Sequence, residues 1–396
     1  MVKRTLDLSG LLPKRQSCFL FGPRASGKTL LVERFLSDSG TSWGINLLEE
    51  DLYHRYLVQP SLIRHEIENH LAATKRVDLP LTIFIDEIQR LPSLLNEVHA
   101  LIERHKGKVR FILTGSSARK LRRGGANLLA GRAWTLHLHP LTHREVAIDL
   151  KRALHYGTLP GIYLSKPSPQ RALRSYVQTY LREEIRQEAL LRRIDAFVRF
   201  MDVAGQMNGE PVNFAKIGRA CGVSIKTVQD YYSILVDTLI AFRLDGWVHS
   251  VRKQLRQQPK FYWFDCGVLN TIRGEIASPP SEGSSRFGNL FETWIILEVI
   301  RLNDYAETDY RFHYWRTNNG MEVDLVLSRD ATHAEKAIEI KSATAPTLED
   351  VRGLLSFQSE NPGTELWCVC RTPRAYTIGA VSFLPWKDAL ARLFPV

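Results

Sequence analysis

Cysteine is scarce in this sequence and long apolar runs are absent, and these two features exclude several classes of protein. The sequence has five cysteines, at Cys18, Cys221, Cys266, Cys368 and Cys370. Because they are odd in number and show no paired spacing, we expect neither a disulfide framework nor a zinc module, and a reducing cytosol fits best. No apolar run approaches the roughly 20 residues that span a bilayer, and residues 1–17 lack the apolar core of a signal peptide. We therefore expect a cytoplasmic protein with no membrane partner.

The sequence also lacks internal repeats and coiled-coil heptads. At about 150 residues per domain, a chain of 396 residues is expected to form two or three domains. An apolar content of 44% with 24% charged residues excludes wholesale disorder. The net charge of +11 is uneven, because residues 101–199 hold 20 basic and 7 acidic side chains while the rest of the chain nets −2. This basic block indicates a polyanionic partner, with a solvated basic surface as an equal alternative.

The first 150 residues alternate short β-rich runs with helical patterns. Residues 18–21, 81–86 and 109–114 are apolar and bounded by loops, as buried parallel strands are. A helical pattern at 94–103 lies between two of them. This alternation predicts an α/β sheet with crossover helices.

A glycine-rich loop follows the first of these strands and precedes a helical stretch. It has the pattern G-x-x-x-x-G-K-T and consists of Gly22, Pro23, Arg24, Ala25, Ser26, Gly27, Lys28 and Thr29. Glycines allow backbone N–H groups to face phosphate oxygens, and the helix dipole favours the same anion. Lys28 would neutralise the β- and γ-phosphates, and the Thr29 hydroxyl would bind Mg²⁺. The loop therefore predicts a site for ATP and Mg²⁺.

Two carboxylates and two hydroxyls at strand ends complete this predicted site. Asp86 and Glu87 close the strand at 81–86, where Asp86 would hold Mg²⁺ and Glu87 would orient and deprotonate the attacking water. An ordinary strand followed by an acidic helix start is the alternative for this pair. Thr114 and Ser116 end the next strand, where a polar side chain would sense the γ-phosphate.

These residues resemble the P-loop ATPases of the AAA+ type, and their order is similar to a bacterial and archaeal AAA+-like family with a C-terminal nuclease-like domain. In that family a Leu-x-Gly-Arg segment and a Pro-Leu-x-x-x-Glu segment follow the sensor strand, matched here by 129–132 and 140–145. The resemblance implies that Arg132 contacts a γ-phosphate, in cis or from a neighbouring subunit, with a surface arginine as the alternative. The arginines that compete for this role are Arg119, Arg122 and Arg123. Because such ATPases complete each site with a residue of the next subunit, the resemblance also implies a homo-oligomer, with a hexamer as one ring size.

Residues 214–228 have the pattern of two helices joined by a glycine turn. Gly222 can take the positive φ of the turn, and Ser224 is a good N-cap for the second helix. The residues expected on the buried face of that helix are Val228, Tyr232 and Leu235. The basic stretch 252–256, up to Lys260, would form a wing that contacts phosphates. Because the second helix carries little charge beyond Lys226, a lid or packing role is favoured over direct DNA contact.

The last part of the chain follows a stretch rich in proline, glycine and serine at 276–285, which predicts a linker. A helix at 287–302 and a strand–turn–strand around Asn318–Gly320 predict an α/β domain. Four of its residues stand out as chemistry-bearing: Glu292, Asp324, Glu339 and Lys341. The strand period of two places the last two on one face. Carboxylates of this kind hold Mg²⁺ near a phosphodiester, while a lysine positions the attacking water.

This set resembles the PD-(D/E)xK nucleases. The resemblance implies that Glu292 is the helix acid, that Asp324 and Glu339 bind Mg²⁺, and that Lys341 is the motif lysine. An ion-pair cluster on strands is the alternative. The same fold also hosts DNA-binding modules that do not cleave.

The sequence therefore predicts an α/β protein of three domains. These are a P-loop AAA+-type ATPase with a parallel sheet at 1–150, a helical and winged-helix domain at 151–275, and a restriction-endonuclease-like domain at 286–396. The main hypothesis is an ATP-driven motor or remodeller acting on DNA, with branched DNA such as a Holliday junction included by analogy. The alternatives are an ATP-controlled switch that binds DNA or a protein without cutting, and a defence-type ATPase-nuclease.

Overall fold

The fold comes from a computed structural model, which describes residues 2–38, 42–73, 80–119, 121, 129–165, 167–181, 194–248 and 257–395. The chain divides into two compact units. The first contains Met1–Leu141 with Asp237–Leu239, and the second contains Thr142–Val236 with Ile240–Val396. Each unit is described by itself.

The first unit is built on a parallel sheet of five strands in the order β2-β3-β4-β1-β5. The strands are β1 (Ser17–Phe21), β2 (Ser42–Asn46), β3 (Leu81–Asp86), β4 (Val109–Gly115) and β5 (Ala133–His137). Strands β1, β3 and β4 are buried along their whole length, because helices cover both faces of a parallel sheet. Since all five strands run the same way, the residues that follow β1, β3 and β4 meet at one edge.

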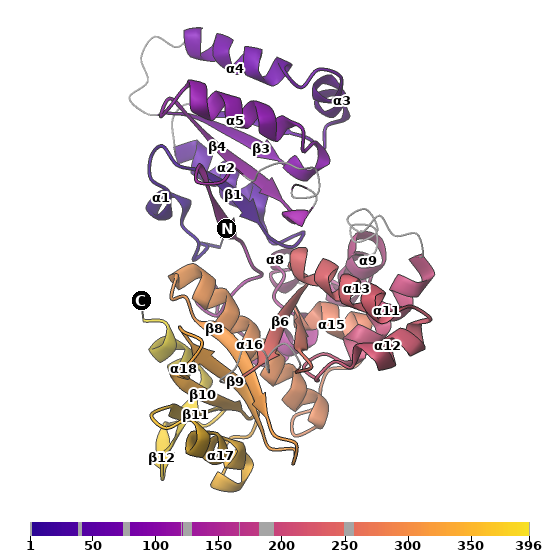
Figure 1. The fold of residues 1–396 in the computed structure, drawn as a ribbon, viewed down its shortest axis with the longest axis vertical. Coiled ribbons are helices and arrows are strands. Elements are labelled where there is room, and N and C mark those ends of the chain that lie inside the picture. Colours follow the sequence, from indigo (N-terminus) through magenta and orange to yellow (C-terminus); the bar gives the residue numbers. More distant parts are fainter. Residues whose placement is uncertain are drawn as a thin grey trace. The chain divides into compact units, whose positions relative to one another are not determined.

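The helices of the first unit pack an apolar core against this sheet. They are α1 (Leu8–Leu11), α2 (Lys28–Asp38), α3 (Glu50–Val58), α4 (Leu62–Ala73) and α5 (Leu94–Arg104). Helices α4 and α5 lie side by side (Figure 1). Helix α5 is amphipathic, and Leu94, Val98 and Leu101 on its inner face are fully buried.

The second unit is built on a mixed sheet of eight strands in the order β12-β13-β11-β10-β9-β8-β6-β7. The strands are β6 (Ala241–Gly246), β7 (Lys260–Trp263), β8 (Arg311–Arg316), β9 (Glu322–Ser328), β10 (Lys336–Ile340), β11 (Glu365–Cys370), β12 (Tyr376–Ile378) and β13 (Val381–Pro385). The five-strand parallel sheet and this mixed sheet confirm the predicted α/β class. The restriction-endonuclease-like and winged-helix assignments stay predictions.

Helices surround the mixed sheet and fill the segment that precedes it. They are α7 (Leu150–Tyr156), α8 (Pro160–Tyr163), α9 (Pro169–Ser175), α11 (Ile194–Gln206), α12 (Phe214–Cys221), α13 (Ile225–Asp237), α15 (Cys266–Ile272), α16 (Ser285–Ala306), α17 (Arg352–Glu360) and α18 (Trp386–Leu393). Helix α16 is the longest of these, and its Ser284 N-cap accepts a hydrogen bond from the Phe287 amide.

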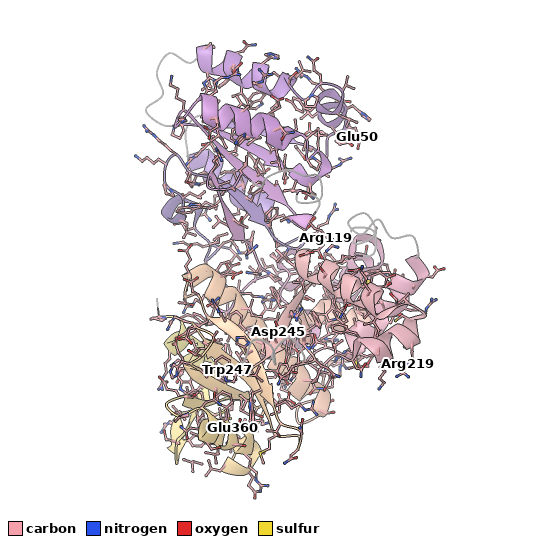
Figure 2. All side chains as sticks on the ribbon, viewed as in Figure 1. Glu50, Arg119, Arg219, Asp245, Trp247 and Glu360 are labelled. Atoms are coloured by element: carbon pink, nitrogen blue, oxygen red, sulfur yellow. The ribbon has the colours of Figure 1, made fainter. Side chains whose placement is uncertain are left out.

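The hairpin of β6 and β7 is continuous with the strands of the C-terminal segment. Strand β6 pairs with β7 antiparallel and with β8 parallel, where Asp245 lies opposite His313. The Trp247 amide then donates to the Tyr314 carbonyl at 2.6 Å, and its indole donates to Asn361 Oδ1 at 2.9 Å. Asp245, within β6, and Trp247, directly after the strand, are labelled in Figure 2. The edge of β6 is thereby paired instead of being left open to solvent.

The predicted linker at 276–285 falls inside the second unit. Ile276 is 3% exposed, and its carbonyl lies 3.0 Å from His155 Nε2. The Arg286 guanidinium donates to the carbonyls of Ser278 and Glu275. This segment is therefore an anchored connection, and the division of residues 151–396 into two domains stays a prediction.

Candidate functional site

The glycine-rich loop turns sharply between β1 and α2, and its backbone demands small residues. A Cβ atom at Gly22 would lie 2.3 Å from the Leu138 carbonyl oxygen, so no larger side chain fits there. Ala25 and Gly27 have positive φ angles of 64° and 94°. Helix α2 begins directly after the loop at Lys28, so that its first amides face the loop.

The side chains inside the loop fit a phosphate. The Lys28 ammonium is 6% exposed and donates to the carbonyls of Gly22 at 2.9 Å and Pro23 at 3.2 Å. The buried Ser26 hydroxyl has no hydrogen-bond partner among the residues that the structure describes. Arg24 and Ala25 in the loop are exposed, and so is Thr29 in the first turn of α2. A charged donor and an unused hydroxyl in one loop match the donors that bind phosphate oxygens.

Arg4 connects the phosphate loop with the segment directly after β5, the strand that lies next to β1 in the sheet. Its guanidinium donates to the Ser26 carbonyl at 2.7 Å and to the His139 carbonyl, just after β5, at 2.6 Å. Sequence reasoning missed Arg4, because no local motif connects a residue near the N-terminus with the loop.

The sequence predicts that Asp86 belongs to the nucleotide site. In the structure Asp86, at the end of β3, connects the start of α2 with the adjacent strand β4. The Thr29 hydroxyl donates to Asp86 Oδ2 at 2.8 Å, and the Thr114 hydroxyl donates to Asp86 Oδ1. Asp86 and Thr114 are 4% and 0% exposed. Hydroxyl and carboxylate oxygens are the ligands that Mg²⁺ prefers, so this pair fits the ion expected there.

Glu87 is held in a sparsely populated backbone conformation, with φ 58° and ψ 44°. Gln89 donates to its carboxylate and, at 3.3 Å, to the Ser116 hydroxyl. Gly115 permits this approach, since a Cβ there would lie 2.5 Å from Gln89 Oε1. The structure thus places Glu87, Thr114 and Ser116 at one sheet edge with Asp86. Gln89 was not foreseen, although the spacing Glu-x-Gln after an apolar strand is a usable signal.

Arg132 lies at the opposite edge of the sheet from the phosphate loop of its own chain. It precedes Ala133, which pairs with Ser17 at the start of β1, whereas the loop follows Phe21 at the end of β1. At about 3.3 Å per residue, β1 separates these positions by about 13 Å, farther than an arginine side chain extends. The Arg132 guanidinium instead pairs with Glu103. This position argues against contact with the γ-phosphate of the same chain, and it leaves supply to another subunit and a surface arginine as the two alternatives.

Of the three competing arginines, the structure describes Arg119. Arg119 forms an ion pair with Asp237, and its side chain is 13% exposed. Arg122 and Arg123 lie outside the described residues.

Part of the basic block is paired with acidic side chains in the part that the structure describes. Ion pairs join Arg104 to Glu68, Lys106 and Arg132 to Glu103, Arg119 to Asp237, and Lys151 to Glu282. Donors to backbone carbonyls are Arg110, Arg144, Arg152 and Arg199. This described part offers a polyanion less charge than the sequence predicted. Arg171 and Arg174 on α9 are exposed. The arginines of the block that fall outside the described residues are Arg122, Arg123, Arg182, Arg186, Arg192 and Arg193.

The helix–turn–helix prediction is confirmed locally. Helices α12 and α13 are joined by Gly222 at φ 68°, and the Ser224 hydroxyl accepts a hydrogen bond from the Thr227 amide at 3.1 Å. The predicted inner face is buried, with Val228 at 0%, Tyr232 at 2% and Leu235 at 0% exposure. Arg219 on α12 is exposed (Figure 2). The predicted wing at 252–256 lies outside the described residues.

The four C-terminal residues come from three elements of the second unit. Glu292 lies on α16, Asp324 on β9 and Glu339 on β10, and Lys341 follows the end of β10. Lys341 Nζ lies 2.7 Å from Glu339 Oε1, and Asp324 Oδ2 accepts a hydrogen bond from the Ile340 amide at 2.8 Å. Glu339 Oε2 is buried without a hydrogen-bond partner among the described residues.

Burial and mutual repulsion dominate the electrostatics of these carboxylates. Burial raises the pKa of Glu292 to about 7, and the Asp324 carboxylate adds to the increase. Burial also raises the pKa of Asp324 and, together with Asp324, raises the pKa of Glu339 well above its usual range. The pKa of Lys341 rises because Glu339 and Asp324 outweigh its own burial. Burial and mutual repulsion thus favour the protonated, uncharged form of these carboxyl groups, which limits the negative charge of the set.

The carboxylates do not form a ready-made metal site. Across the described ranges, no three His, Cys, Asp or Glu side chains are grouped closely enough to hold a metal ion. The carboxylates have other partners in the structure: Tyr262 for Glu292, the Ile340 amide for Asp324, and Lys341 for Glu339. The donor chemistry suits a divalent cation, but the arrangement does not.

Strand β7 contributes two residues that sequence reasoning assigned elsewhere or missed. Lys260, expected at the end of a wing, is 2% exposed and pairs with Glu322 near the carboxylates. The Tyr262 hydroxyl donates to Glu292 Oε1 at 2.7 Å. Only the long-range pairing of the sheet brings these residues to Glu292.

The described residues contain no helix that is both long and apolar enough to cross a bilayer. All five cysteines are buried and free.

Three consecutive stretches of the chain match known families. Residues 14–147 match a family described as an AAA domain. Residues 147–278 match a domain of unknown function (DUF8612), and residues 287–389 match another domain of unknown function (DUF4143). The similar curated proteins are uncharacterized proteins of Mycobacterium bovis and Mycobacterium tuberculosis. Each is 25% identical over 339 residues, which cover 83% of this chain and 71% of the relative.

Two solved structures show a faint likeness. The C. elegans PCH-2 structure has a TM-score of 0.25 and 14% identity, covering 58% of this chain and 64% of that one. The structure of Drosophila ORC bound to AT-rich DNA and Cdc6 has a TM-score of 0.21 and 12% identity, covering 66% and 87%. Both TM-scores are too low to support an argument. The phosphate-loop geometry and the AAA domain match together support a P-loop AAA-like ATPase domain at residues 14–147.

Proposed function

We propose that the chain is an ATP-hydrolysing motor or remodeller that acts on DNA as a cytoplasmic homo-oligomer. One observation carries the ATPase part, namely that the Thr29 and Thr114 hydroxyls both donate to the buried Asp86 carboxylate at the edge where the phosphate loop ends. This arrangement is what a site for Mg²⁺ and ATP requires.

Each residue of this edge has a task toward the nucleotide. Lys28 and the loop amides would hold the phosphates, and Thr29 with Asp86 would hold Mg²⁺. When bound, Mg²⁺ neutralises charge on the phosphate oxygens. Glu87, held by Gln89, would accept the proton of the attacking water, and Thr114 and Ser116 would face the γ-phosphate.

The position of Arg132 supports the proposed oligomer. Because Arg132 cannot reach the loop of its own chain, a role at the γ-phosphate requires a neighbouring subunit. A ring, such as a hexamer, supplies every site with such a neighbour.

The DNA part is supported by the basic block at 101–199, which holds 20 basic and 7 acidic side chains. If the basic block contacts phosphates, DNA binding weakens steeply with salt, and a flat salt response rejects that contact. Branched DNA is one form to compare.

The deciding experiment measures ATP hydrolysis with and without single-stranded, duplex and four-way DNA, together with the native mass. We expect turnover by an oligomer that DNA stimulates, and no turnover by Lys28→Ala. Turnover retained by Lys28→Ala refutes the site, and turnover indifferent to DNA refutes the partner.

We further propose that the C-terminal set is a metal-dependent nuclease site, in which Asp324 and Glu339 would hold the cation, Glu292 would assist and Lys341 would position water. The support is a buried set of carboxylates with an unpartnered Glu339 oxygen. Incubation with Mg²⁺ or Mn²⁺ and several DNA forms tests it. Cleavage that disappears in Asp324→Ala supports the nuclease.

A second candidate is a switch in which ATP controls the binding of DNA or a protein without cleavage. The observation that favours it is that the carboxylates have partners and, in the described chain, are not grouped for a metal. ATP-dependent binding with no cutting under any metal supports this candidate.

A further inference from the structure

Strand β7 places a buried ammonium group beside the C-terminal carboxylates. Lys260 and Tyr262 are two residues apart on this strand and so share one face. They are 2% and 0% exposed. Lys260 Nζ pairs with Glu322 and lies 5.1 Å from the centre of the Tyr314 ring.

A lysine this deeply buried requires compensating negative charge, because removing an ammonium from water is costly. Burial lowers the pKa of Lys260, but the carboxylates of Glu292, Glu322 and Asp324 outweigh it and raise the value to about 12. The ion pair with Glu322 also places the Lys260 ammonium on the face of β9 that carries Asp324, because Glu322 and Asp324 are two residues apart on this strand.

The backbone fixes Lys260 in this place. The segment between α11 and α12 pairs with β7: the Gly209 amide donates to the Phe261 carbonyl, and the Val212 amide donates to the Pro259 carbonyl, both at 2.9 Å. A Cβ at Gly209 would lie 3.2 Å from the Tyr262 ring, so glycine also lets the chain close over this face. Lys260 is thus held by the sheet and by the helical segment before it.

We propose that the Lys260 ammonium is the resident cation of the carboxylate set and competes there with a divalent metal ion. This inference rests on the proposed nuclease site, since it concerns the same carboxylates. It explains why the donors suit a cation although the described residues form no ready-made metal group. The metal affinity of this set is then governed by a residue of the β6–β7 hairpin, more than 60 positions before Asp324 in the sequence.

The test measures Mn²⁺ binding to the full-length, nucleotide-free chain by titration calorimetry. Lys260→Met removes the ammonium and keeps an unbranched side chain, while Lys260→Arg keeps the charge. Lys336→Met is the matched control, because Lys336 also pairs with a glutamate, Glu365, at 2.9 Å and lies 4.8 Å from an aromatic ring centre, that of Trp367. Asp324→Asn shows which part of the binding heat comes from Mn²⁺ bound at the carboxylate set, because that part is lost in this variant. Thermal melting shows that each variant is folded, and Lys260→Gln replaces Lys260→Met if the latter is not.

We expect Lys260→Met to bind Mn²⁺ about tenfold more tightly than the natural chain, since a unit charge a few ångströms away is removed. Lys260→Arg and Lys336→Met should match the natural chain, and Asp324→Asn should abolish the added binding. Equal Mn²⁺ affinity of the natural chain and Lys260→Met overturns the inference. If that binding is lost in Asp324→Asn, the proposed metal site is still supported. Binding by Lys260→Met alone supports the inference and refutes metal use by the natural chain. No binding by either overturns both.

Discussion

Replacing Arg301 with methionine is expected to destabilise the second unit strongly. Arg301 on α16 is 1% exposed and donates to Thr158 Oγ1 at 3.0 Å, to Glu298 Oε1 at 3.3 Å and to the Phe264 carbonyl at 2.8 Å. Glu298 is fully buried. Removing Arg301 leaves Glu298 with His143 as its partner, at 2.9 Å from the amide and 2.7 Å from the ring nitrogen Nδ1. Breaking a buried ion pair by removing one partner costs about 3–5 kcal/mol. Unfolding in urea, followed by tryptophan fluorescence, measures this loss, and Trp294 lies on the same helix.

The chain offers a matched control for this prediction. Arg352 and Glu349 form an ion pair of the same three-residue spacing at 2.9 Å, but their side chains are 70% and 81% exposed. Exposed pairs of this kind contribute little, so Arg352→Met should leave the urea midpoint unchanged. Equal shifts in the two variants, or no shift in Arg301→Met, would show that the buried guanidinium does not stabilise the unit as reasoned.

Three further predictions concern the proposed sites. Lys28→Ala and Arg132→Ala should each lack ATP hydrolysis, but a mixture of the two variants should regain it. In a mixed oligomer the first variant supplies Arg132 to a site that holds the intact Lys28 of the second. A mixture that stays inactive argues against a site shared between subunits. The pKa of Glu292 is raised from its unfolded value near 4.5 to about 7, so the folded chain retains a proton that the unfolded chain loses, and stability should fall as pH rises between these values. Melting temperatures from pH 4.5 to 8 measure this fall, which should shrink in Glu292→Gln, and an identical profile in both chains contradicts the assignment. Tyr262→Phe removes a hydrogen bond that favours the ionised Glu292, so the same profile should shift to higher pH, and an unshifted profile shows that this hydrogen bond does not tune Glu292.

Local sequence patterns were enough to predict the nucleotide edge. The apolar runs give β1, β3 and β4 nearly to the residue, because buried parallel strands are short and bounded by loops. Parallel strands then bring Thr29, Asp86 and Thr114 together at one edge, as the hydrogen bonds of Asp86 show. Gly222 and Ser224 likewise predicted their own turn and cap.

The features that escaped prediction all depend on pairing between distant segments. Lys260 was predicted to belong to a basic wing, because the sequence shows its charge but not its pairing in the sheet. The position of Arg132 at the far edge follows from the register of β5 on β1, which no motif encodes. Gln89 is within reach of Glu87 only because Gly115 leaves space on the adjacent strand.

The parallel pairing of β6 with β8 determines how this protein can be divided for experiment. A fragment that begins at the proline-rich stretch near residue 280 would lack β6 and would present the bare edge of β8 to solvent. It would also lose Trp247, whose indole binds Asn361 in the C-terminal core. Exposed sheet edges recruit other chains, so such a fragment should aggregate. A fragment spanning residues 142–396 keeps the sheet closed on this side, and it is the smaller piece to express when the carboxylate set is studied without the ATPase.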